Sequence, residues 1–157
     1  MSLRQELGDF SSIVCFKYMI VGTEEALGEK AAAIALIAAG RRRGQALAES
    51  LGLKGYPEAF NNLTDLVAQI NKVIGKEGTR LCIVDKIVRA GDRFQVYTRE
   101  TICSAGEPPG SKRECTFTLG AIQGFLETVS GQRLRGKHTE SVLRGSTHDV
   151  LEFSPLA

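Results

Sequence analysis

The order of apolar and polar positions changes from a helical period to a strand period along the chain. Apolar residues recur at helical spacing in 13–20, 29–50 and 63–74, and serines or asparagines suited to N-capping precede the first and third of these segments. The segment SIVCFKYMI is apolar around most of its helical circumference, so we expect its helix to be largely buried. The first half of the chain therefore predicts three helices.

β-Branched residues dominate the next two segments, TRLCIVDKIV and DRFQVYTRE, which meet at Ala90-Gly91 and predict an antiparallel hairpin. The polar segment 101–114 carries two prolines and two glycines and predicts an irregular loop, either a pocket cover or exposed surface. A fourth helix in 115–132 and a second hairpin in 133–153 complete the chain. We expect a single α+β domain over 1–157, with helices packed on one face of a four-stranded antiparallel sheet.

Gly40 and Gly44 lie four residues apart in the alanine-rich segment 29–50, so they share one side of the predicted helix. Such a stripe lets another backbone approach closely, and a ligand against it is the alternative. The small residues Ala33, Ala38, Ala39 and Gly40 make this helix the candidate interface of a homodimer.

Composition and charge limit the partners and the location that we expect for this protein. A net charge of +2 gives no basis for nucleic-acid binding. The basic run 41–43 predicts a solvated helix face, with anionic partners or lipid headgroups at a peripheral membrane contact as the alternative. The longest apolar run, 31–39, is far short of the ~20 residues that span a bilayer. The four scattered cysteines form no CxxC pair, which favours free thiols and a cytoplasmic location.

The C-terminal third, with GFL inside the helix, a glycine at its end and a glycine-centred turn between two strands, resembles the V4R (4-vinyl reductase) domain. The resemblance implies the fold shared with Bet3-type subunits of vesicle-tethering complexes, and a hydrocarbon-binding role. As a small stand-alone domain, the chain is similar to V4R proteins of photosynthetic bacteria, including cyanobacteria. This implies an accessory role in pigment handling or photosystem assembly, with a tetrapyrrole as one candidate ligand.

We expect any hydrophobic ligand to lie beside the fourth helix, where glycines leave room next to aromatic side chains. The alternative is that these residues are ordinary core. The candidate pocket residues are Phe16, Met19, Phe94, Val96, Phe117, Gly120, Gly124 and Phe125.

The resemblance also implies metal-ligand cysteines four positions before and four after the turn glycine. With Gly145 as that glycine, Ser141 and Asp149 occupy these positions, and neither replaces a thiolate pair, so we expect no metal. Strand alternation places both residues inward with the apolar side chains. The remaining polar residues, which are His138, Glu140, His148 and Glu152, are then expected on a solvated outer face.

No nucleotide-binding glycine motif occurs, and both histidines are expected outside, so the sequence favours a binding protein without cofactor over an enzyme. Cys115 at the entrance of the fourth helix is expected to pack, with a reactive thiol as the alternative. Two other functions stay open at this point. One is a dimeric interaction module without ligand, and the other is a vinyl-reductase subunit whose partner supplies the cofactor.

Overall fold

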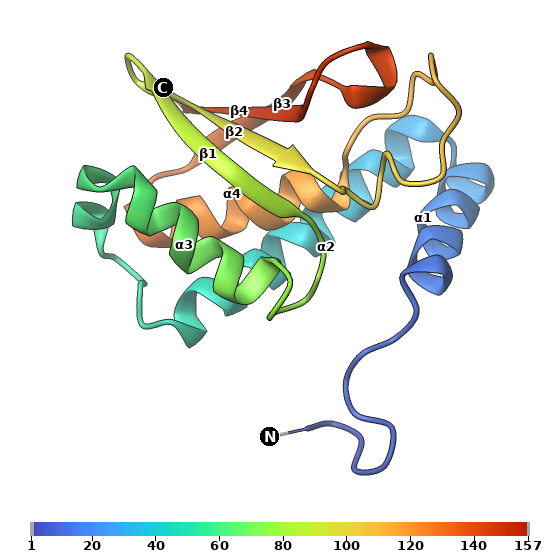
Figure 1. Ribbon diagram of the computed structural model, residues 1–157, viewed down its shortest axis with the longest axis horizontal. Helices are drawn as coiled ribbons and strands as arrows, with labels where there is room; N and C mark the ends of the chain where they lie inside the picture. The colour runs from blue at the N-terminus through green and yellow to red at the C-terminus, as the bar shows by residue number, and fades with distance from the viewer. Residues whose placement is uncertain (1, 157) are drawn as a thin grey trace.

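The computed structural model describes residues 2–156 as helices arranged against one sheet (Figure 1). The α-helices are α1 (Ile13–Leu27), α2 (Glu29–Ser50), α3 (Leu63–Ile74) and α4 (Phe117–Ser130), and the short 3₁₀ helices are η1 (Pro57–Asn61) and η2 (Val142–Arg144). The strands are β1 (Ile83–Ala90), β2 (Arg93–Arg99), β3 (Leu134–Glu140) and β4 (Asp149–Pro155). Segment 101–114 has neither helix nor strand, as predicted.

Local signals set several helix ends. The Ser12 hydroxyl accepts a hydrogen bond from the Val14 amide at 3.2 Å, and the Asn62 side chain accepts one from the Asp65 amide at 3.0 Å. Gly131 ends α4 in the left-handed conformation, with φ of 71°. The predicted bounds of α2 and α3 are confirmed.

The sheet is antiparallel throughout, with strand order β1-β2-β4-β3. Each predicted hairpin forms, and the two hairpins join where β2 pairs with β4 and Val96 lies opposite Leu151. Val96, Leu151 and Phe153 are fully buried on the inner face of the sheet. The predicted α+β class with a four-stranded antiparallel sheet is confirmed.

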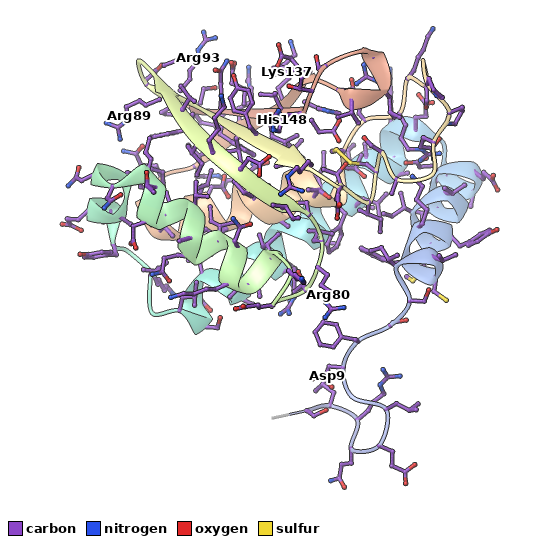
Figure 2. The ribbon with its side chains drawn as sticks, viewed as in Figure 1. Asp9, Arg80, Arg89, Arg93, Lys137 and His148 are labelled. Atoms are coloured by element: carbon purple, nitrogen blue, oxygen red, sulfur yellow. A yellow bond between two sulfur atoms is a disulfide. The ribbon has the colours of Figure 1, made fainter. Side chains whose placement is uncertain are left out.

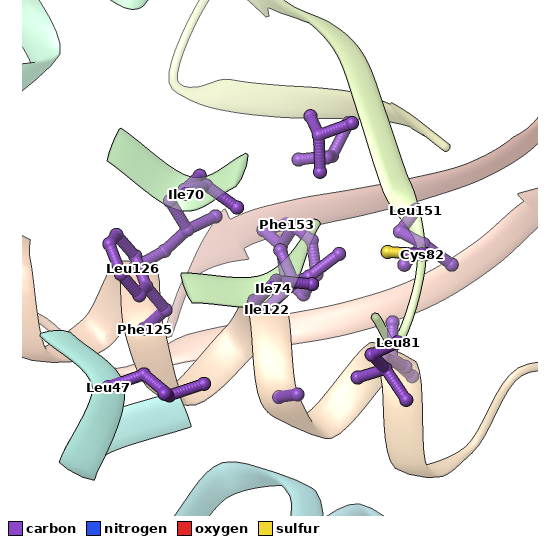
Figure 3. Close-up of a cluster of buried hydrophobic side chains, with 14 of the residues drawn as sticks. Leu47, Ile70, Ile74, Leu81, Cys82, Ile122, Phe125, Leu126, Leu151 and Phe153 are labelled. Carbon is purple, nitrogen blue, oxygen red and sulfur yellow. The ribbon is translucent and has the colours of Figure 1, made fainter. Parts of the chain in front are cut away.

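Helices cover this inner face in two layers. α3 and α4 pack against the sheet, and α2 packs on the far side of α4. The core lies between the sheet and the first helical layer, where Ile70 and Ile74 of α3 meet Ile122 and Phe125 of α4 (Figure 3). None of these side chains is exposed.

Four glycines bring α2 and α4 into backbone contact. A Cβ atom on Gly40 or Gly44 would overlap the α4 backbone, and one on Gly120 or Gly124 would overlap the α2 backbone. The close backbone approach predicted for Gly40 and Gly44 is therefore confirmed, and two other predictions are wrong. No room for a ligand remains beside Gly120 and Gly124, because α2 fills it, and Gly40 faces α4 within the same chain rather than a second copy.

The burial of α1 differs from what the sequence predicted. It lies at the side of the domain, and Ile20 is its only buried residue. Val14, Tyr18 and Met19 are 58%, 74% and 68% exposed. The expected burial is wrong because only one side of the helix meets α2 and the body. Among residues 2–156, no helix combines the length and apolar character needed to cross a membrane.

Candidate functional site

An apolar groove of about 550 Å³ opens between the N-terminal segment, α1, α2 and the end of α3; we call it the α1–α3 groove. It is lined by Asp9, Phe10, Ser11, Ser12, Ile13, Cys15, Phe16, Met19, Arg43, Leu47, Val73, Glu77, Gly78 and Thr79. Its walls come from segments that are far apart in the sequence, so the groove depends on the tertiary fold.

Aromatic and aliphatic side chains form most of its surface. Phe16 and Met19 project from α1, and Leu47 and Val73 form the opposite wall. The Phe16 ring is supported edge-on by Phe117 at the start of α4, with ring centroids 4.9 Å apart. The charged groups of Asp9, Arg43 and Glu77 also line the groove, so it combines apolar area with a few polar groups.

The N-terminal segment reaches the groove as a hydrogen-bonded turn that projects from the body of the domain (Figure 2). The Asp9 carboxylate accepts hydrogen bonds from the Ser2 hydroxyl at 2.9 Å and the Leu3 amide at 2.6 Å. These bonds lower the pKa of Asp9 below its usual value. The next residue, Phe10, lies under the Arg80 guanidinium at 5.6 Å, and both side chains are exposed.

The predicted pocket residues do not form one cavity. Phe16 and Met19 line the α1–α3 groove, and Phe117 contacts Phe16. Phe94 packs against Phe60 of η1, with ring centroids 4.9 Å apart. Val96 and Phe125 are fully buried in the core. Together with the two α4 glycines between the helices, the set divides among four places, and contact of any one of these residues with a ligand stays a prediction.

Leu47, Val73 and Phe10 are groove residues that the sequence did not indicate. Leu47 and Val73 repeat at helical spacing with true core residues, so their pattern gives no sign that a cavity ends there. Phe10 precedes the first helix in a segment without periodicity. No signal in the sequence separates these residues from ordinary packing residues.

A second groove, of about 450 Å³, runs between the outer side of α1 and segment 101–110. Ile13, Tyr18 and Val21 line it from α1, and Ile102 and Ala105 line it from the loop. The irregular loop is thus the wall of a groove along α1.

A polar cluster is buried at the end of the sheet nearest this loop. Oδ2 of Asp149 accepts hydrogen bonds from the hydroxyls of Thr101 at 2.6 Å and Ser104 at 2.7 Å, and Oδ1 accepts one from the Val142 amide at 3.2 Å. Burial raises the pKa of Asp149, but the groups that donate to it outweigh burial and hold that pKa well below its ordinary value. Ser141 and Asp149 are both buried, as the strand alternation predicted.

His138 was expected on the outer face, and its side chain is instead 1% exposed. His138 lies opposite Leu151 and shares its inward face, and a register shift between His138 and Glu140 breaks the alternation that the prediction counted back from Ser141. Nδ1 of His138 accepts a hydrogen bond from the Cys115 amide at 3.1 Å, which places the ring proton of the neutral imidazole on Nε2. Nε2 faces Oδ1 of Asp149 at 3.3 Å.

His148 does lie on the outer side of the sheet, as predicted (Figure 2). Its Nε2 is 2.9 Å from Oδ2 of Asp85, which also receives the Arg99 guanidinium at 3.0 Å. These partly exposed groups are cross-strand polar contacts that flank the Tyr97 ring.

The prediction of free thiols is wrong for two of the four cysteines. Cys103 and Cys115 form a disulfide, so they are not free thiols, and Cys115 does not titrate. The sulfurs and the Asp149 carboxylate lie within 4.8 Å of one another, but sulfurs in a disulfide are not thiolate ligands. The absence of a metal stays a prediction. Cys82 is a free thiol whose pKa is raised to about 12, by burial first and then by the Asp149 charge.

No protein-family model and no curated protein matches the sequence. Among solved structures, the crystal structure of the phenol-responsive sensory domain of the transcription activator PoxR, with phenol, matches with a TM-score of 0.67. The sequences are 12% identical, and the match covers 94% of this chain and 76% of that one. At this identity the likeness concerns the fold, so the chain has the fold of that sensory domain.

Proposed function

We propose that this protein binds a small hydrophobic molecule in the α1–α3 groove and does so without catalysis. The observation that carries the proposal is the groove itself, whose Phe16 and Met19 offer apolar surface beside a few charged groups. Its volume of about 550 Å³ falls within the ~300–1,000 Å³ of typical ligand sites. The edge-on support of Phe16 by Phe117 gives the apolar wall a fixed shape.

The fold supports this proposal. The PoxR sensory domain, which is similar in structure, holds phenol. Membership of the V4R family is part of the proposal, resting on the C-terminal sequence pattern and this shared fold. Two more specific proposals follow. The first is a tetrapyrrole ligand, and the second is a cytoplasmic role in pigment handling or photosystem assembly in a cyanobacterium or another photosynthetic bacterium. They rest on the V4R resemblance alone.

Calorimetric titration of the oxidised protein with phenol, 1-naphthol and protoporphyrin tests the ligand class. We expect saturable binding of at least one of these probes. Binding of phenol or 1-naphthol favours a small aromatic ligand, and preference for protoporphyrin favours the tetrapyrrole. If none of the three binds, the proposal of an aromatic or tetrapyrrole site is wrong.

Three exposed α1 residues locate the site. Met19 lies in the α1–α3 groove, Tyr18 lies in the second groove, and Leu27 lines neither of them. All three are more than half exposed, so glutamate at any of them should leave the fold intact. Met19→Glu places a charge in the groove and should abolish binding, whereas Leu27→Glu should bind like wild type. Loss of binding in Tyr18→Glu alone would assign the ligand to the second groove.

A dimeric interaction module is the second candidate, favoured by the apolar side chains that α1 and α2 expose. Ile34 on α2 is 74% exposed, and Ala35 and Ala38 beside it are also exposed. We propose that a homodimer uses this outer side of α2. Ile34→Glu should convert a dimer to a monomer in sedimentation equilibrium. A wild-type protein that is monomeric at all concentrations contradicts the dimer. The role as a vinyl-reductase subunit stays a prediction.

A further inference from the structure

The Cys103–Cys115 disulfide closes an otherwise irregular segment of the chain (Figure 2). Cys103 follows β2, and Cys115 lies two residues before α4. Both residues are almost fully buried, at 4% and 2% exposed. We call 103–115 the clasp segment, because its ends are joined by this bond.

The clasp segment and the residue before it hold α1 through one partly buried lysine, Lys17. Nζ of Lys17 donates hydrogen bonds to the carbonyl oxygens of Ile102 at 3.0 Å and Cys103 at 2.8 Å. The same ammonium group lies 2.9 Å from the Glu107 carboxylate. Because a lysine ammonium with three acceptors is well satisfied, Lys17 is a strong attachment point for the helix.

A second attachment lies about two turns further along α1. Arg113 of the clasp segment pairs with Glu24 of α1 and, at 2.9 Å, with Glu107 of its own segment. Side chains of Lys17, Glu107 and Arg113 are all less than one-fifth exposed. These ion pairs are therefore screened less by solvent than surface pairs.

Beyond these attachments, α1 contacts the body through Ile20, through Phe16 on Phe117 and along α2. Ile20 is its only buried residue, while its outer side is exposed apolar surface. The position of α1, and with it the position of Phe16 and Met19 in the α1–α3 groove, therefore depends on the clasp segment.

The other side of the clasp segment is fixed to the sheet. The Cys115 amide donates to His138 of β3, and the Ser104 hydroxyl donates to Asp149 of β4. The disulfide thus joins Cys103, whose carbonyl oxygen accepts a hydrogen bond from Lys17, to Cys115, whose amide donates to His138 on β3. Two thiols cannot approach as closely as two bonded sulfur atoms, so reduction at this buried position must separate the two sulfur atoms and disturb the packing around them.

We propose that the Cys103–Cys115 disulfide is a redox-responsive clasp that holds α1 in place and thereby controls binding in the α1–α3 groove. The control of binding rests on the proposed function, whereas the clasp itself does not. In the reduced protein the clasp segment and α1 open more often, and the groove loses one wall.

A dithiol is the reductant that this step requires. Its thiolate attacks one cysteine sulfur, forms a mixed disulfide and releases the other cysteine as a thiol after protonation. The second thiol of the reductant then displaces the first cysteine, and the reductant leaves as a disulfide. Two electrons and two protons pass to the protein. Because both sulfurs are buried, attack follows local opening, and a bound ligand that holds α1 closed should slow reduction.

Amide hydrogen exchange measured by mass spectrometry compares the oxidised protein with protein reduced by dithiothreitol. We expect reduction to speed exchange by about tenfold in 13–27 and 103–115, while α3 stays unchanged. Unchanged exchange in both segments overturns the clasp. Cys15→Ser, which removes the exposed free thiol, should keep the redox response, because Cys15 takes no part in the disulfide.

Two variants keep the test independent of the reductant. Cys103→Ser with Cys115→Ser should exchange like the reduced protein under all redox conditions. Lys17→Met should speed exchange in α1 and weaken the response of α1 to reduction, because only the Arg113–Glu24 pair still joins α1 to the clasp segment, while the clasp segment itself still responds. If α1 of Lys17→Met responds to reduction as wild type does, the connection through Lys17 is wrong. If the double variant does not fold, the dithiothreitol comparison still decides the clasp.

The effect on the groove is measured by titrating 1-naphthol into oxidised and reduced protein. We expect the affinity to fall by about tenfold on reduction. Equal affinities overturn the control of binding. If the oxidised protein binds none of the three probes, the proposed function fails instead, and the exchange measurement alone decides the clasp.

Discussion

Nε2 of His138 and Oδ1 of Asp149 lie 3.3 Å apart in a pocket of the protein interior where neither side chain is more than 1% exposed. Asp149 is the acceptor for the hydroxyls of Thr101 and Ser104, so one carboxylate joins β3, β4 and the loop that precedes α4. A buried carboxylate of this kind stabilises the fold only while its donors remain in place.

Asp149 should make stability depend on pH in the acid range. Its folded-state pKa lies below the ordinary value of 3.8, so its contribution is fully present above that pH. The contribution is lost as the pH falls through the lower, folded-state pKa. We expect wild type to lose stability below about pH 5 and Asp149→Asn to lose less over the same interval, as measured by urea unfolding from pH 2 to 7.

At pH 7 the Asp149→Asn variant should be less stable than wild type by roughly 2–4 kcal/mol, because the amide replaces one acceptor oxygen with a donor. Glu140→Gln on β3 is the matched control, since Glu140 is exposed and makes none of these contacts. A pH profile of Asp149→Asn parallel to that of wild type contradicts the role assigned to the carboxylate.

Replacing a glycine between α2 and α4 even by alanine should lower the stability of the protein. Gly44→Ala places a Cβ against the Ala121 carbonyl and should lower the free energy of unfolding by roughly 1–3 kcal/mol or more. Gly22→Ala in α1 is the control, because a Cβ there meets open space. Removing a helical glycine without a clash should raise stability by up to about 1 kcal/mol. Chemical denaturation would show opposite signs for the two variants, and a similar change in both would contradict the close crossing.

Local signals predicted the elements well where several of them agreed. Asn62 and the apolar spacing of Leu66, Ile70 and Ile74 together defined α3, and the Ala90-Gly91 turn defined the first hairpin. These features act over a few residues, so they are readable from a single sequence.

The site was less predictable because it depends on tertiary geometry. His138 faces inward with its partner Leu151, and a bulge between His138 and Glu140 breaks the alternation counted back from Ser141; bulges need no particular residue type. The Cys103–Cys115 bond joins two cysteines in and beside an irregular loop, where no period indicates that they meet. The sequence of α1 is apolar around most of the helix, and nothing in it indicated that most of this surface would lack a packing partner. The grooves along α1 follow from that exposure.

Asn71 of α3 completes the edge of the sheet through its side-chain amide. Its Nδ2 donates to the Val84 carbonyl at 2.7 Å, and its Oδ1 accepts from the Val84 amide at 3.0 Å. Val84 lies on β1, the edge strand, where alternate backbone groups point away from the neighbouring strand. One amide side chain therefore replaces the missing strand at this position.

Asn71→Leu keeps the approximate size of the side chain but leaves the N–H and C=O groups of Val84 without their partner. We expect a loss of roughly 2–4 kcal/mol in urea unfolding, because two backbone groups lose their hydrogen bonds at a partly buried position. The Val84 amide should also exchange faster with solvent. Lys72→Ala, on the exposed side of the same helix, should change stability by less than about 0.5 kcal/mol. Equal stability of the two variants would mean that water satisfies Val84 and that Asn71 does not hold α3 to the sheet.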